Sequence, residues 1–95
     1  MCHVSHLYET GASLYFTFLA AAKDGEELDQ WRTAKRMACE AIVASGATIT
    51  HHHAVGTDHA PYLSAEVGDV GITALRAVKA ALDPAGILNP GKLIS

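Results

Sequence analysis

Charged residues are scarce in this sequence, and neither sign of charge dominates. Only 18% of its 95 residues are Asp, Glu, Lys or Arg, and seven basic side chains stand against ten acidic ones, for a formal net charge of -3. A surface that binds nucleic acid needs clustered Lys and Arg to neutralise phosphates. The composition therefore predicts no nucleic-acid partner.

Long apolar runs and secretion signals are also lacking. The charge-free segments between Glu9 and Lys23 and between Glu40 and Asp58 are broken by Gly, Ser, Thr or His. Both fall short of the roughly 18 apolar residues that a membrane span needs. The first residues, Met-Cys-His-Val-Ser-His, carry neither the basic nor the apolar region of a signal peptide. With only two cysteines and no disulfide pattern, the sequence predicts a cytoplasmic protein without a transmembrane segment.

No phosphate-binding glycine loop is present. The eight glycines never form the Gly-x-Gly-x-x-Gly or Walker spacing, in which backbone N–H groups cradle phosphates. We therefore expect this chain to hold no nucleotide cofactor by itself.

The sequence predicts one small domain that is 49% hydrophobic and contains segments with the apolar spacing of strands and segments with that of helices. Residues 3–20 predict a β-hairpin, since residues 13–19 alternate in the manner of a strand and Gly11 supplies a turn. A helix should follow the cap-like residues 24–27 and end at Ser45-Gly46. The β-branched residues 47–50 predict a strand that runs into residues 51–53.

The second half of the chain predicts a loop, a helix and a turn-rich tail. Residues 54–68 contain three glycine or proline breaks and indicate a loop, with one helical turn near residues 62–66. Asp69 can cap a second helix that stops at Asp83-Pro84. The predicted fold class is α+β, with a hairpin, helix, strand and helix around a small mixed sheet, half of a ferredoxin-like arrangement. The strand–helix–strand order favours parallel pairing of the two strands that flank the first helix.

Six histidines, three of them consecutive, are the outstanding feature of the composition. On a strand, the period of two would place His51 and His53 on the side of Ile49, and His52 on the other. His51 and His53 then suit two ligands of a zinc site, with His3, His6 or His59 as a third. The alternative is that these imidazoles only make hydrogen bonds at a strand end.

Tyr8 and His6 share strand parity with Val4, so a phenol and an imidazole are expected to project together at the turn end of the hairpin. A phenol transfers protons when a positive charge or an imidazole tunes its pKa. The alternative for Tyr8 is a packed tyrosine with its hydroxyl in water.

Four segments match patterns of known flavoproteins: residues 5–8, residues 14–17, residues 50–56 and the tail Asp83-Pro-Ala-Gly-Ile-Leu-Asn-Pro-Gly-Lys-Leu93. Together they resemble the C-terminal part of FAD-linked oxidases of the vanillyl-alcohol oxidase type. The tail is typical of that wide group. The histidine triplet, preceded by Ser-His-x-Tyr, is most similar to its alkylglycerone-phosphate synthase branch. Two departures are Ala54, where many members have glycine, and residues 57–59, which replace a basic stretch.

The resemblance implies a C-terminal substrate or cap domain over residues 1–95, with FAD held mainly by a separate domain of the same enzyme. It implies exchange of the acyl chain of acyl-dihydroxyacetone phosphate for a fatty alcohol, a step of ether-lipid synthesis. Tyr8, His51, His52 and His53 match catalytic positions, and His52, His53 and Asn89 match cofactor-binding positions, with no metal.

Two further expectations and two alternatives accompany this resemblance. The substrate should be a lipid-like small molecule, and an isolated chain should form a homodimer. One alternative is a fragment of an FAD-linked oxidase or dehydrogenase of a 2-hydroxy acid or alcohol. Another is a stand-alone α+β module for dimerisation or metal binding.

Overall fold

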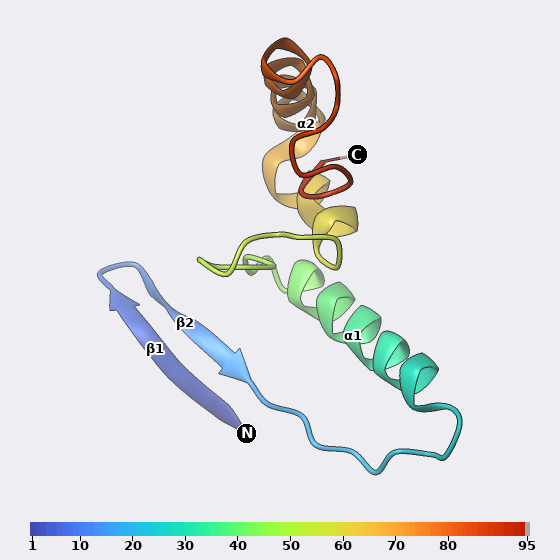
Figure 1. Cartoon of the computed structure of the whole chain (residues 1–95). Coiled ribbons are helices and arrows are strands. Elements are labelled where there is room, and N and C mark those ends of the chain that lie inside the picture. Colours follow the sequence, from blue (N-terminus) through green and yellow to red (C-terminus); the bar gives the residue numbers. More distant parts are fainter. Residues whose placement is uncertain (95) are drawn as a thin grey trace. The chain divides into compact units, whose positions relative to one another are not determined.

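A computed structural model describes residues 1–94 and divides the chain into two compact units (Figure 1). The first unit, Met1–Thr33, holds strands β1 (Cys2–Tyr8) and β2 (Gly11–Phe16). Helix α1 (Glu27–Ala44) crosses the boundary between the units. The second unit starts at Ala34 and holds the short 3-10 helix η1 (Ala60–Tyr62) and helix α2 (Leu63–Leu82). The α+β fold class is confirmed.

The predicted hairpin is confirmed, with a shorter ladder than the sequence suggested. β1 and β2 pair antiparallel from Cys2↔Phe16 to Tyr8↔Gly11, and two further bonds join Met1 to Thr17 at the open end. The regular alternation stops at Phe16, so Phe18 and Leu19 lie beyond the strands and are exposed. The register slips between Ser5 and Leu7, which marks His6 as the extra residue of a β-bulge.

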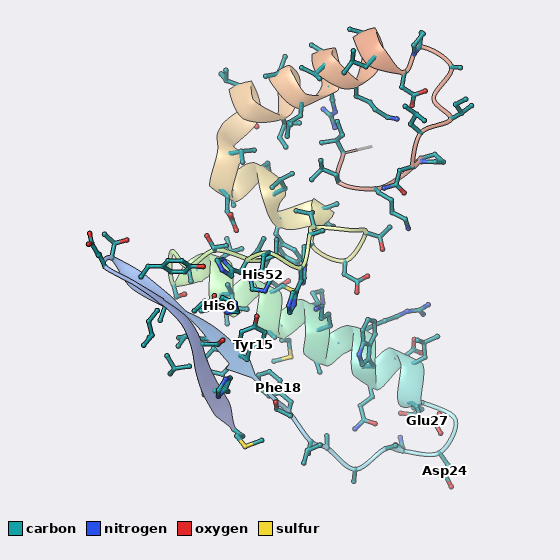
Figure 2. The ribbon with its side chains drawn as sticks, turned by 60° about the vertical axis from the view of Figure 1, so that its left-hand side comes forward. His6, Tyr15, Phe18, Asp24, Glu27 and His52 are labelled. Atoms are coloured by element: carbon teal, nitrogen blue, oxygen red, sulfur yellow. The ribbon has the colours of Figure 1, made fainter. Side chains whose placement is uncertain are left out.

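Helix α1 ends where the sequence predicted and begins within a residue of the expected start after residues 24–27. Asp24 lies in a turn with Gly25 at φ +79°, and the first helical residue is Glu27 (Figure 2). At the other end Gly46, at φ +75°, donates to Val43 O, and Ala47 N donates to Ile42 O. This pair of bonds is the Schellman motif, which satisfies the last carbonyl groups of a helix.

The predicted strand over residues 47–53 is wrong, and so is the mixed, parallel sheet that depended on it. Among residues 1–94 the sheet has two antiparallel strands, and residues 47–53 are irregular, with bends at Ile49 and at residues 51–53. The backbone N–H of Ile49 donates to the Glu66 carboxylate, and Thr50 Oγ1 donates to Ala54 O. β-branched residues favour a strand only where a neighbouring strand can pair with them. Here the N–H of Ile49 bonds to a side chain of α2 instead of to a neighbouring strand.

Helix α2 is interrupted at Gly68, as the predicted boundary at Asp69 suggests. Gly68 has φ +68° and ψ 171°, a conformation open almost only to glycine, and helical geometry resumes at Asp69. The helical turn predicted near residues 62–66 is present as η1 and the start of α2, with Pro61 in the first turn of η1. The helix stops at Leu82, just before Asp83 and Pro84, as predicted.

The buried apolar side chains are Cys39, Ile49 and Leu63, all in the second unit, and Asp83 is the one buried charged residue among residues 1–94. Many large apolar side chains of both units are exposed, including Leu14, Phe18, Trp31 and Met37. No helix in the described part of the chain is long and apolar enough to cross a membrane.

Candidate functional site

The bulge at His6 moves Tyr8 to a different face of the hairpin from the one predicted. Val4 pairs with Leu14 and Leu7 with Ala12, so these four side chains share one face. Tyr8 pairs with Gly11, on the opposite face, together with the His3–Tyr15 pair. The prediction that Tyr8 shares a face with Val4 is therefore wrong. It failed because an extra residue reverses the alternation beyond it.

The residues around the bulge are polar and aromatic. His6 has φ +50°, the left-handed conformation that such a bulge uses, and its Nδ1 lies 2.9 Å from Ser5 Oγ in a hydrogen bond. On the Tyr8 face, the rings of His3 and Tyr15 lie 6.3 Å apart across the two strands. Bulges are frequent beside active sites because they redirect a side chain. Here the redirected side chain is the candidate acid or base, Tyr8.

The three histidines lie on an exposed loop that follows α1, which Figure 2 marks by His52. The ring centroids of His51 and His52 are 4.5 Å apart, and those of His52 and His53 are 4.8 Å apart, both edge to face. The alternation expected of a strand does not apply to this loop. The zinc hypothesis thereby loses the strand geometry on which its His-x-His pair depended.

A single hydrogen bond closes the loop around the triplet. Thr50 Oγ1 donates to Ala54 O at 3.1 Å, so the bond spans all three histidines. Ala54 has φ +70°, a left-handed conformation in which a Cβ is unfavourable. This left-handed turn explains why glycine, which has no Cβ, suits position 54. The loop thus holds three imidazoles outward on a short, closed segment.

The loop is connected to the rest of its unit on both sides. Before the triplet, the buried Ile49 donates its N–H to Glu66 of α2. After the triplet, Gly56 O accepts the N–H of Leu93 at 3.1 Å, and Val55 O accepts that of His59 at 3.3 Å. His59, proposed above as a third zinc ligand, has a buried Nδ1 without a hydrogen-bond partner.

The tail begins at a buried carboxylate. Asp83 accepts N–H bonds from Ile87 and Leu88, each at 3.0 Å, and forms an ion pair with Lys79. Lys79 also donates to Leu88 O. The hydrogen bond from Lys79 is the main cause that lowers the pKa of Asp83, and the two backbone N–H bonds lower it further, against the effect of burial.

Asn89, the predicted cofactor residue of the tail, is exposed and has φ +46°. Asparagine tolerates this left-handed conformation better than most residues. Gly86 and Gly91, on either side, also have positive φ, so the tail turns repeatedly between Asp83 and Leu93. Asn89 therefore lies on the same turn-rich segment as Leu93. The N–H of Leu93 bonds to the loop over residues 50–56 that carries the three histidines, here called the triplet loop.

Tyr62 is a second phenol that sequence reasoning did not select. Burial raises its pKa, and the nearby Cys39 and Glu40 raise it further. Tyr62 is half-buried and is the last residue of η1, directly before α2. The pattern offered no signal for it beyond the neighbouring proline.

The second unit brings together the triplet loop and the tail, through Gly56 and Leu93, while Tyr8 belongs to the first unit. Sequence reasoning missed Asp83 as a site-building residue and treated it only as a helix stop. The signal was available, because Asp before Pro commonly accepts bonds from backbone N–H groups that follow it. The three-residue spacing of the apolar Val4 and Leu7 was a weak sign of the bulge, whereas the pattern gave no sign of the Glu66 bond.

Comparison with known proteins finds a matching family and several similar proteins. Residues 1–93 match the family described as "FAD linked oxidases, C-terminal domain". The chain is 39% identical over 93 residues to an alkyldihydroxyacetonephosphate synthase of Trypanosoma brucei brucei, and 35% identical over 92 residues to that of Dictyostelium discoideum. These alignments cover 98% and 97% of this chain.

A relative with another name is nearly as similar. The glycolate oxidase subunit GlcD of Bacillus subtilis is 37% identical over 83 residues, or 87% of this chain. The chain spans only 15% of the length of the two synthases and 18% of that of GlcD. No solved structure matches the chain.

Proposed function

Because the chain belongs to the family of C-terminal domains of FAD-linked oxidases, we propose that it completes the substrate site of a flavin-dependent alkylglycerone-phosphate synthase. The reaction exchanges the acyl chain of acyl-dihydroxyacetone phosphate for a fatty alcohol and releases a fatty acid. The observation that carries this proposal is similarity to three synthases over nearly the whole chain, at 35–39% identity. The triplet loop lies within every one of these aligned lengths.

The polar groups on the exposed segments suit a flavin. An isoalloxazine ring has carbonyl and ring-nitrogen acceptors and one N–H donor, and imidazole and amide side chains complement both kinds of group. His52, His53 and Asn89 are exposed and offer such groups, so they are the residues proposed to contact the ring. FAD, when bound, supplies a ring that can carry the exchanged group without net redox change. The cofactor would be held mainly by an FAD-binding domain outside this chain.

The proposed chemistry assigns proton transfer to the side chains described above. In the net exchange, the bond between the carbon next to the substrate carbonyl and the acyl oxygen breaks, the fatty acid leaves as a carboxylate, and the oxygen of the fatty alcohol bonds to the same carbon. Tyr8 takes a proton from this carbon and later returns one to it, so that the proton of the alcohol is the one released. His51, His52 and His53 donate hydrogen bonds to charge that develops on the reacting oxygens and tune the protonation of the site. Their exposure on a closed loop supports this role, because they can reach a ligand without rearrangement of a packed core.

The exposed apolar side chains support a partner domain. Monomers seldom leave large contiguous apolar patches in water. Within the first unit, Val4, Leu7 and Leu14 are exposed on one face of the hairpin. We assign this surface to the FAD-binding domain of the same enzyme and, in an isolated chain, to a second copy in a homodimer. Both cysteines are free thiols, which fits a reducing cytoplasmic compartment.

The alternative function is oxidation of a 2-hydroxy acid or alcohol. Its support is the 37% identity to the glycolate oxidase subunit GlcD. The departure at residues 57–59, where no basic stretch follows the triplet, also favours a substrate without phosphate. The same side chains would then take the hydroxyl proton of the substrate, and the flavin would accept the hydride.

A substrate panel separates the two functions. The complete flavoenzyme, meaning the protein that joins this domain to its FAD-binding domain, is incubated with acyl-dihydroxyacetone phosphate and a fatty alcohol, or with glycolate and lactate plus an artificial electron acceptor. The proposal expects release of fatty acid that requires the alcohol, with no reduction of the acceptor. Acceptor reduction by a hydroxy acid without acyl exchange would establish the alternative.

A further inference from the structure

Asp83 is a charged side chain buried at the end of a helix whose other terminal residues are exposed. Its relative exposure is 7%, whereas that of Leu82 is 76%. The side chain of Asp83 bonds to the tail and to Lys79, which itself donates to Leu88 O. A buried carboxylate requires such partners. The charge of Asp83 therefore organises the first residues of the tail.

The tail then returns to the loop that carries the histidines. Residues 84–92 contain three left-handed positions, Gly86, Asn89 and Gly91, which reverse the chain. Leu93, itself at φ +62°, donates its N–H to Gly56 O. A bulky residue rarely adopts this conformation without surrounding structure that holds it there. The red tail in Figure 1 accordingly folds back from the C-terminal end of α2.

The Leu93 bond restrains the side of the triplet loop that follows the histidines. Glu66 holds the loop before the triplet, through Ile49 N, and the bond from Thr50 Oγ1 to Ala54 O spans the three histidines. On the side after the triplet the described backbone bonds are those of Gly56 O and Val55 O, and the latter leads only into η1. Gly56 has φ +61°, a conformation that glycine adopts readily, so the loop has little stiffness of its own here.

We infer that Asp83 is a positioning residue for the histidine triplet: it anchors the tail so that Leu93 restrains Gly56 and sets the orientation of the loop over residues 50–56. Asp83 contacts no reacting group and acts through the tail alone. The part of this inference that concerns catalysis rests on the proposed function, since it assumes that the triplet faces the flavin and substrate.

Backbone NMR of the 95-residue chain tests the anchoring directly. Asp83→Asn removes the charge that Lys79 and two N–H groups bind, and deletion of residues 93–95 removes the Leu93 donor while leaving Asp83 intact. Both changes should shift the amide signals of residues 51–56, and Asp83→Asn should raise hydrogen exchange at Leu93 by about tenfold or more. Asp69→Asn, an exposed carboxylate on the same helix, is the matched control. Unchanged triplet signals in the deletion variant would overturn the inference, even if Asp83→Asn fails to fold.

Kinetics of the complete flavoenzyme test the consequence for catalysis. Asp83→Asn should lower kcat by about tenfold to a hundredfold through misplacement of the triplet, with KM little changed and the flavin content retained. Normal kcat together with shifted triplet signals would overturn the positioning role. Absence of both acyl exchange and hydroxy-acid oxidation in the unsubstituted enzyme would instead contradict the proposed function, and the NMR result would still decide the anchoring.

Discussion

The hairpin and the triplet loop hold their candidate catalytic side chains by different means. Tyr8 lies on a paired strand, where backbone bonds from Cys2 to Tyr8 set the register and one bulge sets the face. The triplet lies on bends, and the bonds that hold its loop include those of the Thr50 hydroxyl, the Glu66 carboxylate and the Leu93 N–H. A side-chain bond disappears with one substitution, whereas a ladder does not. The placement of the triplet should therefore be far more sensitive to point mutation than that of Tyr8.

The largest expected effect comes from removal of the proposed proton-transfer groups themselves. In the complete flavoenzyme, Tyr8→Phe and single alanine substitutions at His51, His52 and His53 should each lower turnover by about two to four powers of ten. Tyr15→Phe removes a phenol from the same face of the hairpin and is the matched control. Circular dichroism should show the fold retained. Near-normal turnover in Tyr8→Phe would show that the hairpin supplies no proton-transfer group through Tyr8.

A smaller effect is expected from the bond that holds the triplet loop before the histidines. Glu66→Ala leaves the N–H of the buried Ile49 without its acceptor and should cost about 1–3 kcal/mol of unfolding free energy. Glu66→Gln keeps an amide oxygen at the same position and should lose less. Urea unfolding of the 95-residue chain measures both. Equal losses in the two variants would show that the bond itself contributes little.

Acid should weaken the anchor of the tail while leaving the hairpin ladder unchanged. The pKa of Asp83 is lowered in the folded chain, chiefly by its bond with Lys79, so its contribution to stability is present above the ordinary carboxyl pKa of about 4. That contribution is lost as the pH falls through the lowered pKa. Unfolding free energy should decline less steeply with acid in Asp83→Asn than in the unsubstituted chain. Parallel pH profiles for the variant and the unsubstituted chain would contradict the stabilising bond between Asp83 and Lys79.

The smallest expected effect concerns strain at the end of the triplet. Ala54→Gly relieves a left-handed conformation that costs roughly 1–2 kcal/mol for a residue with a Cβ, while the added freedom of the unfolded chain takes back part of this gain. The net expectation is a stabilisation of about 0.5–1 kcal/mol in urea unfolding. Ala47→Gly, just after α1, is a comparison without a positive φ. A loss of stability in Ala54→Gly would show that the loop is not strained there.

The sequence was sufficient wherever local rules decide the structure. The hairpin, the Gly46 end of α1 and the stop before Pro84 follow from alternation, a left-handed cap and the restriction that proline imposes on its predecessor. Each depends only on neighbouring residues. These features could therefore be predicted with nearly the right boundaries.

Features that depend on partners distant in the sequence could not be predicted from one sequence alone. Residues 47–50 have strand propensity, but the N–H of Ile49 meets a carboxylate 17 positions away instead of another strand. The bulge at His6 reverses the face of Tyr8. The spacing of Val4 and Leu7, three positions apart, departs from a period of two but does not by itself identify the extra residue. The candidate residues could be selected by resemblance, whereas their orientation required the folded chain.

The most direct test of the central claim is the visible absorption spectrum of the flavin in the complete flavoenzyme. The claim is that the triplet of this domain lies against the isoalloxazine ring, whose absorption bands respond to the polarity and charge of their surroundings. The account predicts that His52→Ala and His53→Ala shift these bands, while His3→Ala, which changes an imidazole on the hairpin, leaves them in place. Superimposable spectra for all three variants and the unsubstituted enzyme would contradict it.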